Sequence, residues 1–118
     1  METHKNLLVW QKSISFVTTV YNLTKTFPKE ELYGIVSQIR RAAVSIPSNM
    51  VEGCARRNTK EYIQFLYVSL GSAAELETQL IISYNLNFIK ENDKQRLSID
   101  LEEIIRMLTG LIRSLNNK

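Results

Sequence analysis

The sequence is poor in the residues that build disulfides, metal sites and tight turns. Its 118 residues include one cysteine (Cys54), one histidine (His4), four glycines and two prolines. A single cysteine excludes an intramolecular disulfide, and one cysteine with one histidine excludes a conventional zinc site. So few glycines and prolines leave few places to turn, which argues against a sandwich or barrel of many short strands.

Long apolar runs are also missing. The longest unbroken ones are four residues each, Leu7–Trp10 and Phe65–Val68, so we expect no segment that spans a membrane. The first six residues lack the basic stretch and long apolar run of a secretory signal. We therefore expect a cytoplasmic protein.

The hydrophobic and charged fractions, 44% and 23%, are those of an ordinary globular protein. Its length suits one domain over residues 1–118. Apolar residues recur three or four positions apart in four segments, which predicts helices over about 7–25, 30–57 and 59–86, and a fourth capped by Asn92 or Asp93. Four helices with short connections predict an all-α fold, an antiparallel up-down-up-down four-helix bundle.

Several residues indicate how these helices begin, bend and end. Pro47 falls inside the second pattern, where it removes a backbone donor, so we expect a kink rather than a stop. Asn58 and Glu61 read as a capping box that opens the third helix. Asn87 is a plausible left-handed residue at its end.

Two segments carry more apolar surface than one bundle core requires. The first has two adjacent apolar stripes, and the third has Val68 and Ile82 on the side away from its main apolar line, next to Gly71. A lone bundle would leave these side chains exposed, and contiguous apolar patches usually mark contacts. The pattern predicts a homo-oligomer.

A polar stripe lies opposite the apolar line of the second segment. Its spacing of 3, 4, 4 and 3 residues places all members on one helix face: Gln38, Arg41, Ser45, Asn49 and Glu52. Because a solvated face more often uses Lys and Glu, one interpretation is a partly buried network that reaches Glu75 or Gln79 of the third segment. The alternative, given equal weight, is an ordinary solvent-exposed face.

Candidate catalytic and metal-binding residues are few. Helical bundles can hold di-iron centres, but these need Glu-x-x-His pairs, and His4 lies outside every predicted helix. Serine and cysteine nucleophiles lack a histidine base for the same reason. Two arginines after Cys54 could lower its pKa, although a small helix residue is the favoured interpretation. We expect no enzyme, no metal and no cofactor.

The net charge of +3 is unevenly spread, because residues 1–60 hold nine Lys and Arg against four Asp and Glu. The excess lies in two clusters, Arg40-Arg41 and 56–60. Arginine forks bind phosphate, so the candidate nucleic-acid contacts are Arg40, Arg56, Arg57 and Lys60. Arg41 is expected to be structural because it shares the polar stripe. The alternative for these clusters is salt bridges to nearby acids.

The most distinctive motif runs from Arg40 to Asn49, RRAAVSIPSN. Others are Val9–Lys12 (VWQK), Tyr21–Thr24 (YNLT), Phe27-Pro28, Glu52-Gly53 and Glu75-Leu76-Glu77. With these motifs, essentially the whole chain resembles the bacterial four-helix-bundle family first noted in 23S rRNA intervening sequences. Met50-Val51 stands where the family usually has Ile-Ala, a mild change.

The resemblance implies a compact antiparallel bundle that commonly assembles into a ring of five subunits. The family that the chain resembles is also similar to accessory proteins of diversity-generating retroelements, which bind nucleic acid and a reverse transcriptase. The implied partners are therefore further copies of the chain, RNA and a reverse transcriptase-like protein. No catalytic residues are implied.

Two functions follow from these observations. The first is a non-catalytic oligomeric protein that binds RNA through clustered arginines with little sequence selectivity. The second is a protein–protein interaction scaffold without nucleic-acid binding, whose charges only keep it dissolved.

Overall fold

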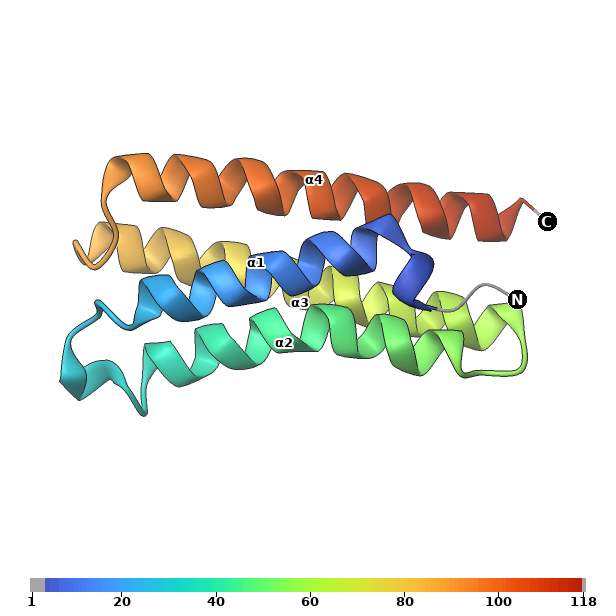
Figure 1. Cartoon of the computed structure of the whole chain (residues 1–118), viewed down its shortest axis with the longest axis horizontal. Helices are drawn as coiled ribbons and strands as arrows, with labels where there is room; N and C mark the ends of the chain where they lie inside the picture. The colour runs from blue at the N-terminus through green and yellow to red at the C-terminus, as the bar shows by residue number, and fades with distance from the viewer. Residues whose placement is uncertain (1–3, 118) are drawn as a thin grey trace.

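The computed structural model describes residues 4–117. Its four long helices are α1 (Leu8–Thr24), α2 (Ile35–Cys54), α3 (Thr59–Asn85) and α4 (Glu91–Asn116), with short 3-10 helices η1 (His4–Asn6) and η2 (Lys29–Glu31). The described residues form no strand. Successive long helices lie side by side and run in opposite directions, in a body measuring 46 × 24 × 20 Å (Figure 1). The prediction of an all-α four-helix bundle is confirmed.

Each long helix buries one apolar line in a shared core. In α4 the buried apolar line consists of Leu97, Leu101, Ile104, Leu108 and Ile112. In α1 the buried stripe contains Phe16 and Val20, whereas Ile14 and Tyr21 of the other stripe remain exposed. The broad apolar surface of α1 is therefore divided between the core and the outside.

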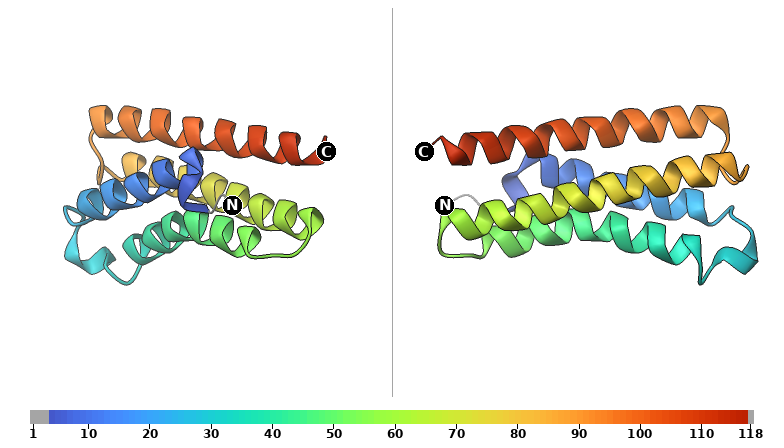
Figure 2. Two further views of the ribbon diagram at one scale, coloured as in Figure 1. Left: turned by 45° about the vertical axis from the view of Figure 1, so that its right-hand side comes forward. Right: turned by 180° about the vertical axis from the view of Figure 1, so that it is seen from behind.

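Small side chains let α2 and α3 pack closely along their length (Figure 2). Ala43 of α2 and Ala73 of α3 are fully buried. The buried Ser69 hydroxyl of α3 donates a hydrogen bond of 2.8 Å to the Ile46 carbonyl of α2. This hydrogen bond fixes the position of α2 relative to α3, the two helices that carry most of the polar and basic candidate residues.

Helix α2 continues through Pro47, which lies inside it and is buried. Proline has no N–H to donate to the carbonyl four residues earlier, that of Ala43. The helix does not stop at Pro47, as expected. The kink stays a prediction.

The start of α2 was predicted five residues too early. Pro28 is followed by the single turn of η2, and Gly34 then leaves the helical conformation with φ −107° and ψ −115°. Helix α2 begins only at Ile35. Leu32, which the predicted range 30–57 included in the helix, precedes it and is 45% exposed. Glycine has no Cβ, so its backbone can adopt angles outside the helical region at little steric cost. Gly34 therefore permits the interruption between η2 and α2.

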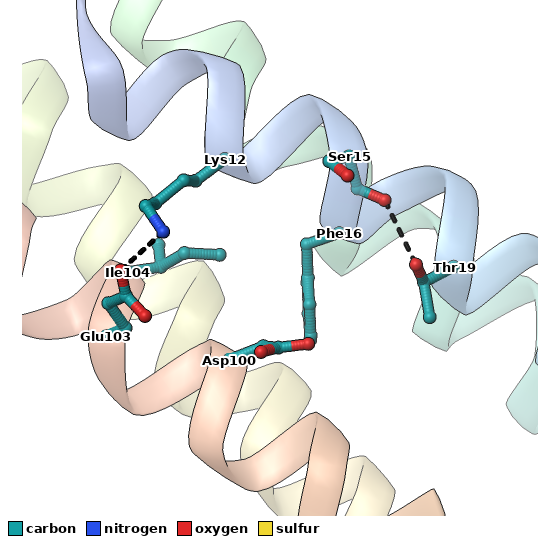
Figure 3. A pocket seen from close by; sticks show the side chains of 7 residues that line it. All are labelled: Lys12, Ser15, Phe16, Thr19, Asp100, Glu103 and Ile104. Carbon is teal, nitrogen blue, oxygen red and sulfur yellow. Dashed lines mark hydrogen bonds and ion pairs between the residues drawn. The ribbon is translucent and has the colours of Figure 1, made fainter.

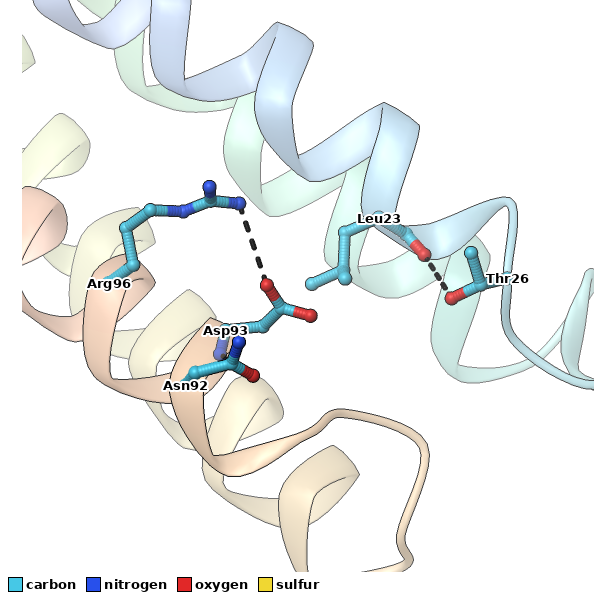
Figure 4. Close-up of polar contacts among 5 residues, drawn as sticks. All are labelled: Leu23, Thr26, Asn92, Asp93 and Arg96. Atoms are coloured by element: carbon cyan, nitrogen blue, oxygen red, sulfur yellow. Dashed lines mark hydrogen bonds and ion pairs between the residues drawn. The ribbon is translucent and has the colours of Figure 1, made fainter.

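The start of α4 also differs from the prediction. The helix begins at Glu91 after Lys90, which forms no side-chain cap. The Asn92 side chain accepts a bond only from the adjacent Asp93 N–H, and Asp93 pairs with Arg96 one turn on (Figure 4). Both proposed caps therefore lie inside the helix.

Asn58 as the cap of α3 and Asn87 as the left-handed residue after it are confirmed, whereas the return bond of a capping box, from Glu61 to the Asn58 N–H, is not seen among the described residues. The Asn58 side chain accepts a 2.8 Å hydrogen bond from the Glu61 N–H and caps α3. Asn87 has φ 66°, the left-handed conformation expected after this helix. Within residues 4–117, no helix combines the length and apolar character needed to cross a bilayer.

Candidate nucleic-acid interface

The two basic clusters lie at opposite ends of α2 (Figure 1). Arg40 and Arg41 are in its first half, near the connection from α1, whereas Arg56, Arg57 and Lys60 lie at the connection to α3. Sixteen residues separate Arg40 from Arg56 in the sequence; at a rise of 1.5 Å per residue, this is roughly 24 Å. One copy of the chain thus presents two separate basic surfaces.

At the α2–α3 connection, the three cations have different surroundings. The Arg56 guanidinium lies 3.2 Å from the Glu52 carboxylate and 4.7 Å above the centre of the Phe65 ring. Arg57 and Lys60 are exposed, and neither forms an ion pair with another described residue. The available positive charge at this end therefore belongs mainly to Arg57 and Lys60.

Arg40 and Arg41 have surroundings opposite to those expected. Arg40 donates through Nε to the Thr24 hydroxyl, 2.9 Å, and through Nη2 to the Tyr21 carbonyl, 3.4 Å. Its guanidinium also lies 4.6 Å from the centre of the Tyr21 ring. Arg41 is exposed and its side chain forms no hydrogen bond within residues 4–117. The structural role expected of Arg41 is therefore corrected: among the described residues it is Arg40 that ties α2 to α1. Contact of either arginine with RNA stays a prediction.

The polar stripe of α2 forms a smaller network than expected. Asn49 donates to both the backbone carbonyl and the hydroxyl of Ser45, at 2.8 and 2.9 Å. The Ser45 hydroxyl is 2.8 Å from that of Ser72 on α3, a partner that the sequence did not indicate. The network is therefore a triad of short side chains that joins α2 to α3.

The other members expected in this network are exposed. Glu52 pairs with Arg56 at the far end of α2. The Glu75 carboxylate accepts a long bond of 3.4 Å from Gln79 on its own helix. The expected link from α2 to Glu75 or Gln79 is therefore corrected to the Ser45–Ser72 contact. Gln38, Arg41 and Glu75 instead line one polar groove of about 610 Å³, together with Ser45 and Ser72.

Tyr33 is a surface residue that the sequence pattern did not single out. It lies between η2 and α2 and is 93% exposed. It lines the polar groove and also a second groove of about 450 Å³, on the α1 side of α2, together with Arg40. The signal in the sequence was the adjacent Gly34, which breaks the expected helix and leaves the aromatic ring outside it.

Cys54 has a hydrogen-bonded role at the end of α2. Its thiol lies 3.4 Å from the Tyr62 hydroxyl of α3 and is assigned as the donor. Burial raises the pKa of the Tyr62 hydroxyl far above its usual value. The contact joins the last turn of α2 to the first turn of α3.

A small polar cavity of about 150 Å³ lies between α1 and α4 (Figure 3). Lys12 of α1 forms an ion pair of 2.5 Å with Glu103 of α4 at its edge. The hydrogen bond from Lys12 holds the pKa of Glu103 below its usual value. Among the described residues, no three His, Cys, Asp or Glu side chains gather closely enough to hold a metal ion.

The fold and its surfaces define a class of protein: a small four-helix bundle that carries arginines near both ends of its second long helix, α2. The chain belongs to the 23S rRNA-intervening sequence protein family, whose family model matches residues 5–110. The resemblance inferred from the motifs is therefore confirmed.

A solved structure gives the same fold. It is the crystal structure of a protein of unknown function from the S23 ribosomal protein family of Bacteroides thetaiotaomicron. The two chains share 26% sequence identity with a TM-score of 0.84, over 90% of this chain and 96% of the other. A comparison with curated proteins found no match.

Proposed function

We propose that this chain is a non-catalytic, cytoplasmic homo-oligomer that binds RNA through its exposed arginines and lysine, with little sequence selectivity. The observation that carries the proposal is the pair of exposed cations at the α2–α3 connection, Arg57 and Lys60, which no carboxylate of the described residues neutralises. Such cations bind a phosphate backbone and release its counterions. The family's association with 23S rRNA in its name makes RNA the preferred anion.

Assembly would strengthen this weak binding. Each copy has a net charge of only +3. A closed ring repeats the same basic surface by symmetry, and binding at one copy raises the effective concentration of RNA at the next. Multivalency thus allows a modestly basic chain to bind a long phosphate backbone.

The outer apolar surfaces support the oligomer. Trp10, Ile14 and Val17 of α1 and Val44 and Val51 of α2 line a largely apolar groove of about 280 Å³. On α3, the side chains of Val68 and Ile82 are exposed, Val68 one turn before Gly71. A contiguous apolar surface such as the groove between α1 and α2 usually marks a contact with another protein.

Light scattering coupled to size exclusion tests the oligomer. We expect a mass several times that of the 13.6 kDa chain, with five copies as the family resemblance implies. The physical reason is that identical contacts close most simply into a ring, in which every copy buries the same apolar surface. A monomer mass at micromolar protein concentration contradicts the prediction.

A double substitution, Arg57→Ala with Lys60→Ala, tests RNA binding. We expect lower affinity, and a plot of log affinity against log salt that is flatter by about 0.7 for each phosphate of single-stranded RNA that the protein no longer neutralises. Both side chains are exposed, so the fold and the oligomer should remain intact. Fluorescence anisotropy with labelled RNA over a range of salt concentrations measures both quantities.

The matched control is Arg106→Ala with Arg113→Ala on α4, which removes the same charge from exposed positions outside the basic clusters. If both doubles weaken binding equally, only the net charge matters and the assignment to the α2–α3 connection is wrong. If the parent protein binds no RNA at low salt, the proposal fails. The apolar groove between α1 and α2 then favours the protein–protein scaffold.

A further inference from the structure

Tyr33 contributes little to the stability of one copy of the chain. Its side chain is 93% exposed, and it forms no side-chain hydrogen bond or ring contact within residues 4–117. By contrast, Tyr21 lies under Arg40, Tyr62 is bonded to Cys54, and Tyr84 is bonded to Glu91. An aromatic ring left in water on a connection is more typical of binding than of packing.

Two guanidinium groups accompany this ring. Tyr33, Ser37 and Arg41 line both grooves that meet there, and Arg40 lines the one on the α1 side. The hydrogen bonds to Thr24 and Tyr21 use two of the five N–H donors of Arg40 and hold its guanidinium in place. Arg40 is therefore an ordered cation with donors to spare, and Arg41 is an exposed one.

The charges of the two grooves differ. The polar groove has the Glu75 carboxylate on its α3 side, which repels a phosphate. The groove on the α1 side is lined by Tyr21, Leu32, Tyr33, Arg40, Arg41 and Val44, together with Ser37, and has no acidic side chain in its lining. An aromatic surface with two cations and no carboxylate among its lining residues suits a ligand that has both a flat ring and a phosphate. The Glu31 carboxylate lies outside this lining, beside Gly34.

We propose that Tyr33, with Arg40 and Arg41 beside it, is a stacking site for an unpaired base of single-stranded RNA, a proposal that rests on the RNA binding proposed above. The base stacks on the phenol ring, and the neighbouring phosphate binds the guanidinium groups. Every base has a flat π-face, so the site does not require a particular sequence. A duplex keeps its bases paired and stacked, so it can use only the arginines.

The test compares Tyr33→Ala with Tyr33→Phe, which keeps the ring and removes only the hydroxyl. The probes are a labelled single-stranded oligouridylate of about 12 nucleotides and an RNA duplex of similar length. We expect Tyr33→Ala to bind the single strand about 5- to 150-fold more weakly, and Tyr33→Phe to bind it nearly as the parent does. Duplex affinity and the salt dependence should be the same in all three proteins, because no cation is removed.

Two further measurements locate the effect. Photocrosslinking of a 4-thiouridine oligonucleotide should label the Tyr33 peptide in the parent and lose that label in Tyr33→Ala. Thermal unfolding and light scattering should be unchanged by the substitution, because the side chain is exposed. A lower oligomer mass for Tyr33→Ala would overturn the proposal and assign the ring to a contact between copies.

The remaining outcomes separate this proposal from the broader one. If the parent binds RNA but Tyr33→Ala leaves the preference for single strands unchanged, the stacking site is overturned while RNA binding stands. An equal loss on single-stranded and duplex RNA overturns it in the same way. If the parent binds neither probe, RNA binding itself fails, and the exposed ring remains as a surface for a protein.

Discussion

Replacing Ile104 by alanine is expected to lower the free energy of unfolding by about 2–5 kcal/mol. Ile104 lies in the middle of α4 and is 1% exposed. It faces Phe16 of α1 across the small cavity between the two helices (Figure 3). The loss combines the transfer of buried methyl and methylene groups with the larger cavity left behind.

Chemical denaturation of the parent and variant at equal protein concentration measures this loss, because assembly makes stability concentration-dependent. The control is Ile99→Ala on the same helix, where the side chain is 63% exposed. That substitution should change stability by less than about 0.5 kcal/mol. A loss below about 0.5 kcal/mol for Ile104→Ala would mean that the position is not in the core.

The apolar period made the core of α4 predictable from sequence, because one helix face must be buried in any bundle. The ends of helices were less predictable. Asn58 was recognisable because its side chain caps α3 directly. At the start of α4, the side chain of the N-cap residue Lys90 forms no capping hydrogen bond. Asn92 resembles a cap in the sequence, but it lies inside the helix. The break at Gly34 was missed because the pattern from Leu32 to Ile39 keeps a helical spacing across it.

The arginines show what spacing alone leaves open. Arg40 and Arg41 are neighbours in sequence but point about 100° apart on a helix with 3.6 residues per turn. Only Arg40 points toward α1, where its side chain forms hydrogen bonds with Thr24 and Tyr21. The position of α1 therefore decides which of the two arginines is fixed in place. The stripe of α2 was correctly placed on one face, yet its contact with α3 depends on Ser72, which carries no distinctive signal of its own.

The same limit applies to the function of the exposed surfaces. Sequence places Arg57 and Lys60 in one basic cluster, but it does not show that Glu52 neutralises Arg56 and leaves the other two cations available. The predicted range of the second helix also includes Tyr33, and nothing in the spacing singles that residue out. The structure puts that ring in solvent next to two arginines, and this change of environment makes it a candidate binding residue.

Gly53→Ala is the substitution with the other large expected effect. Gly53 is buried in the last turn of α2. A methyl group there would lie 2.7 Å from Cδ1 of the Tyr62 ring, 3.1 Å from Cβ of Phe65 and 3.2 Å from the Tyr62 carbonyl oxygen. The first distance is too short for any carbon–carbon contact, and the carbonyl belongs to the backbone of α3. The Tyr62 ring is also tied to Cys54 through its hydroxyl, so it has little freedom to move away.

Alanine in an exposed helix interior is normally more stable than glycine by about 0.5–1 kcal/mol. At Gly53 the clash should reverse the sign, and we expect a loss of about 1–3 kcal/mol as the ends of α2 and α3 are forced apart. Gly110→Ala in α4 is the matched control, because a methyl group there meets no atom within 4 Å. It should stabilise the protein by about 0.5–1 kcal/mol. Denaturation midpoints that move in opposite directions for the two variants would support close contact between α2 and α3 as the reason for glycine at position 53. Equal stabilisation by both substitutions would contradict this, because it would show that α2 and α3 can separate at Gly53 without cost.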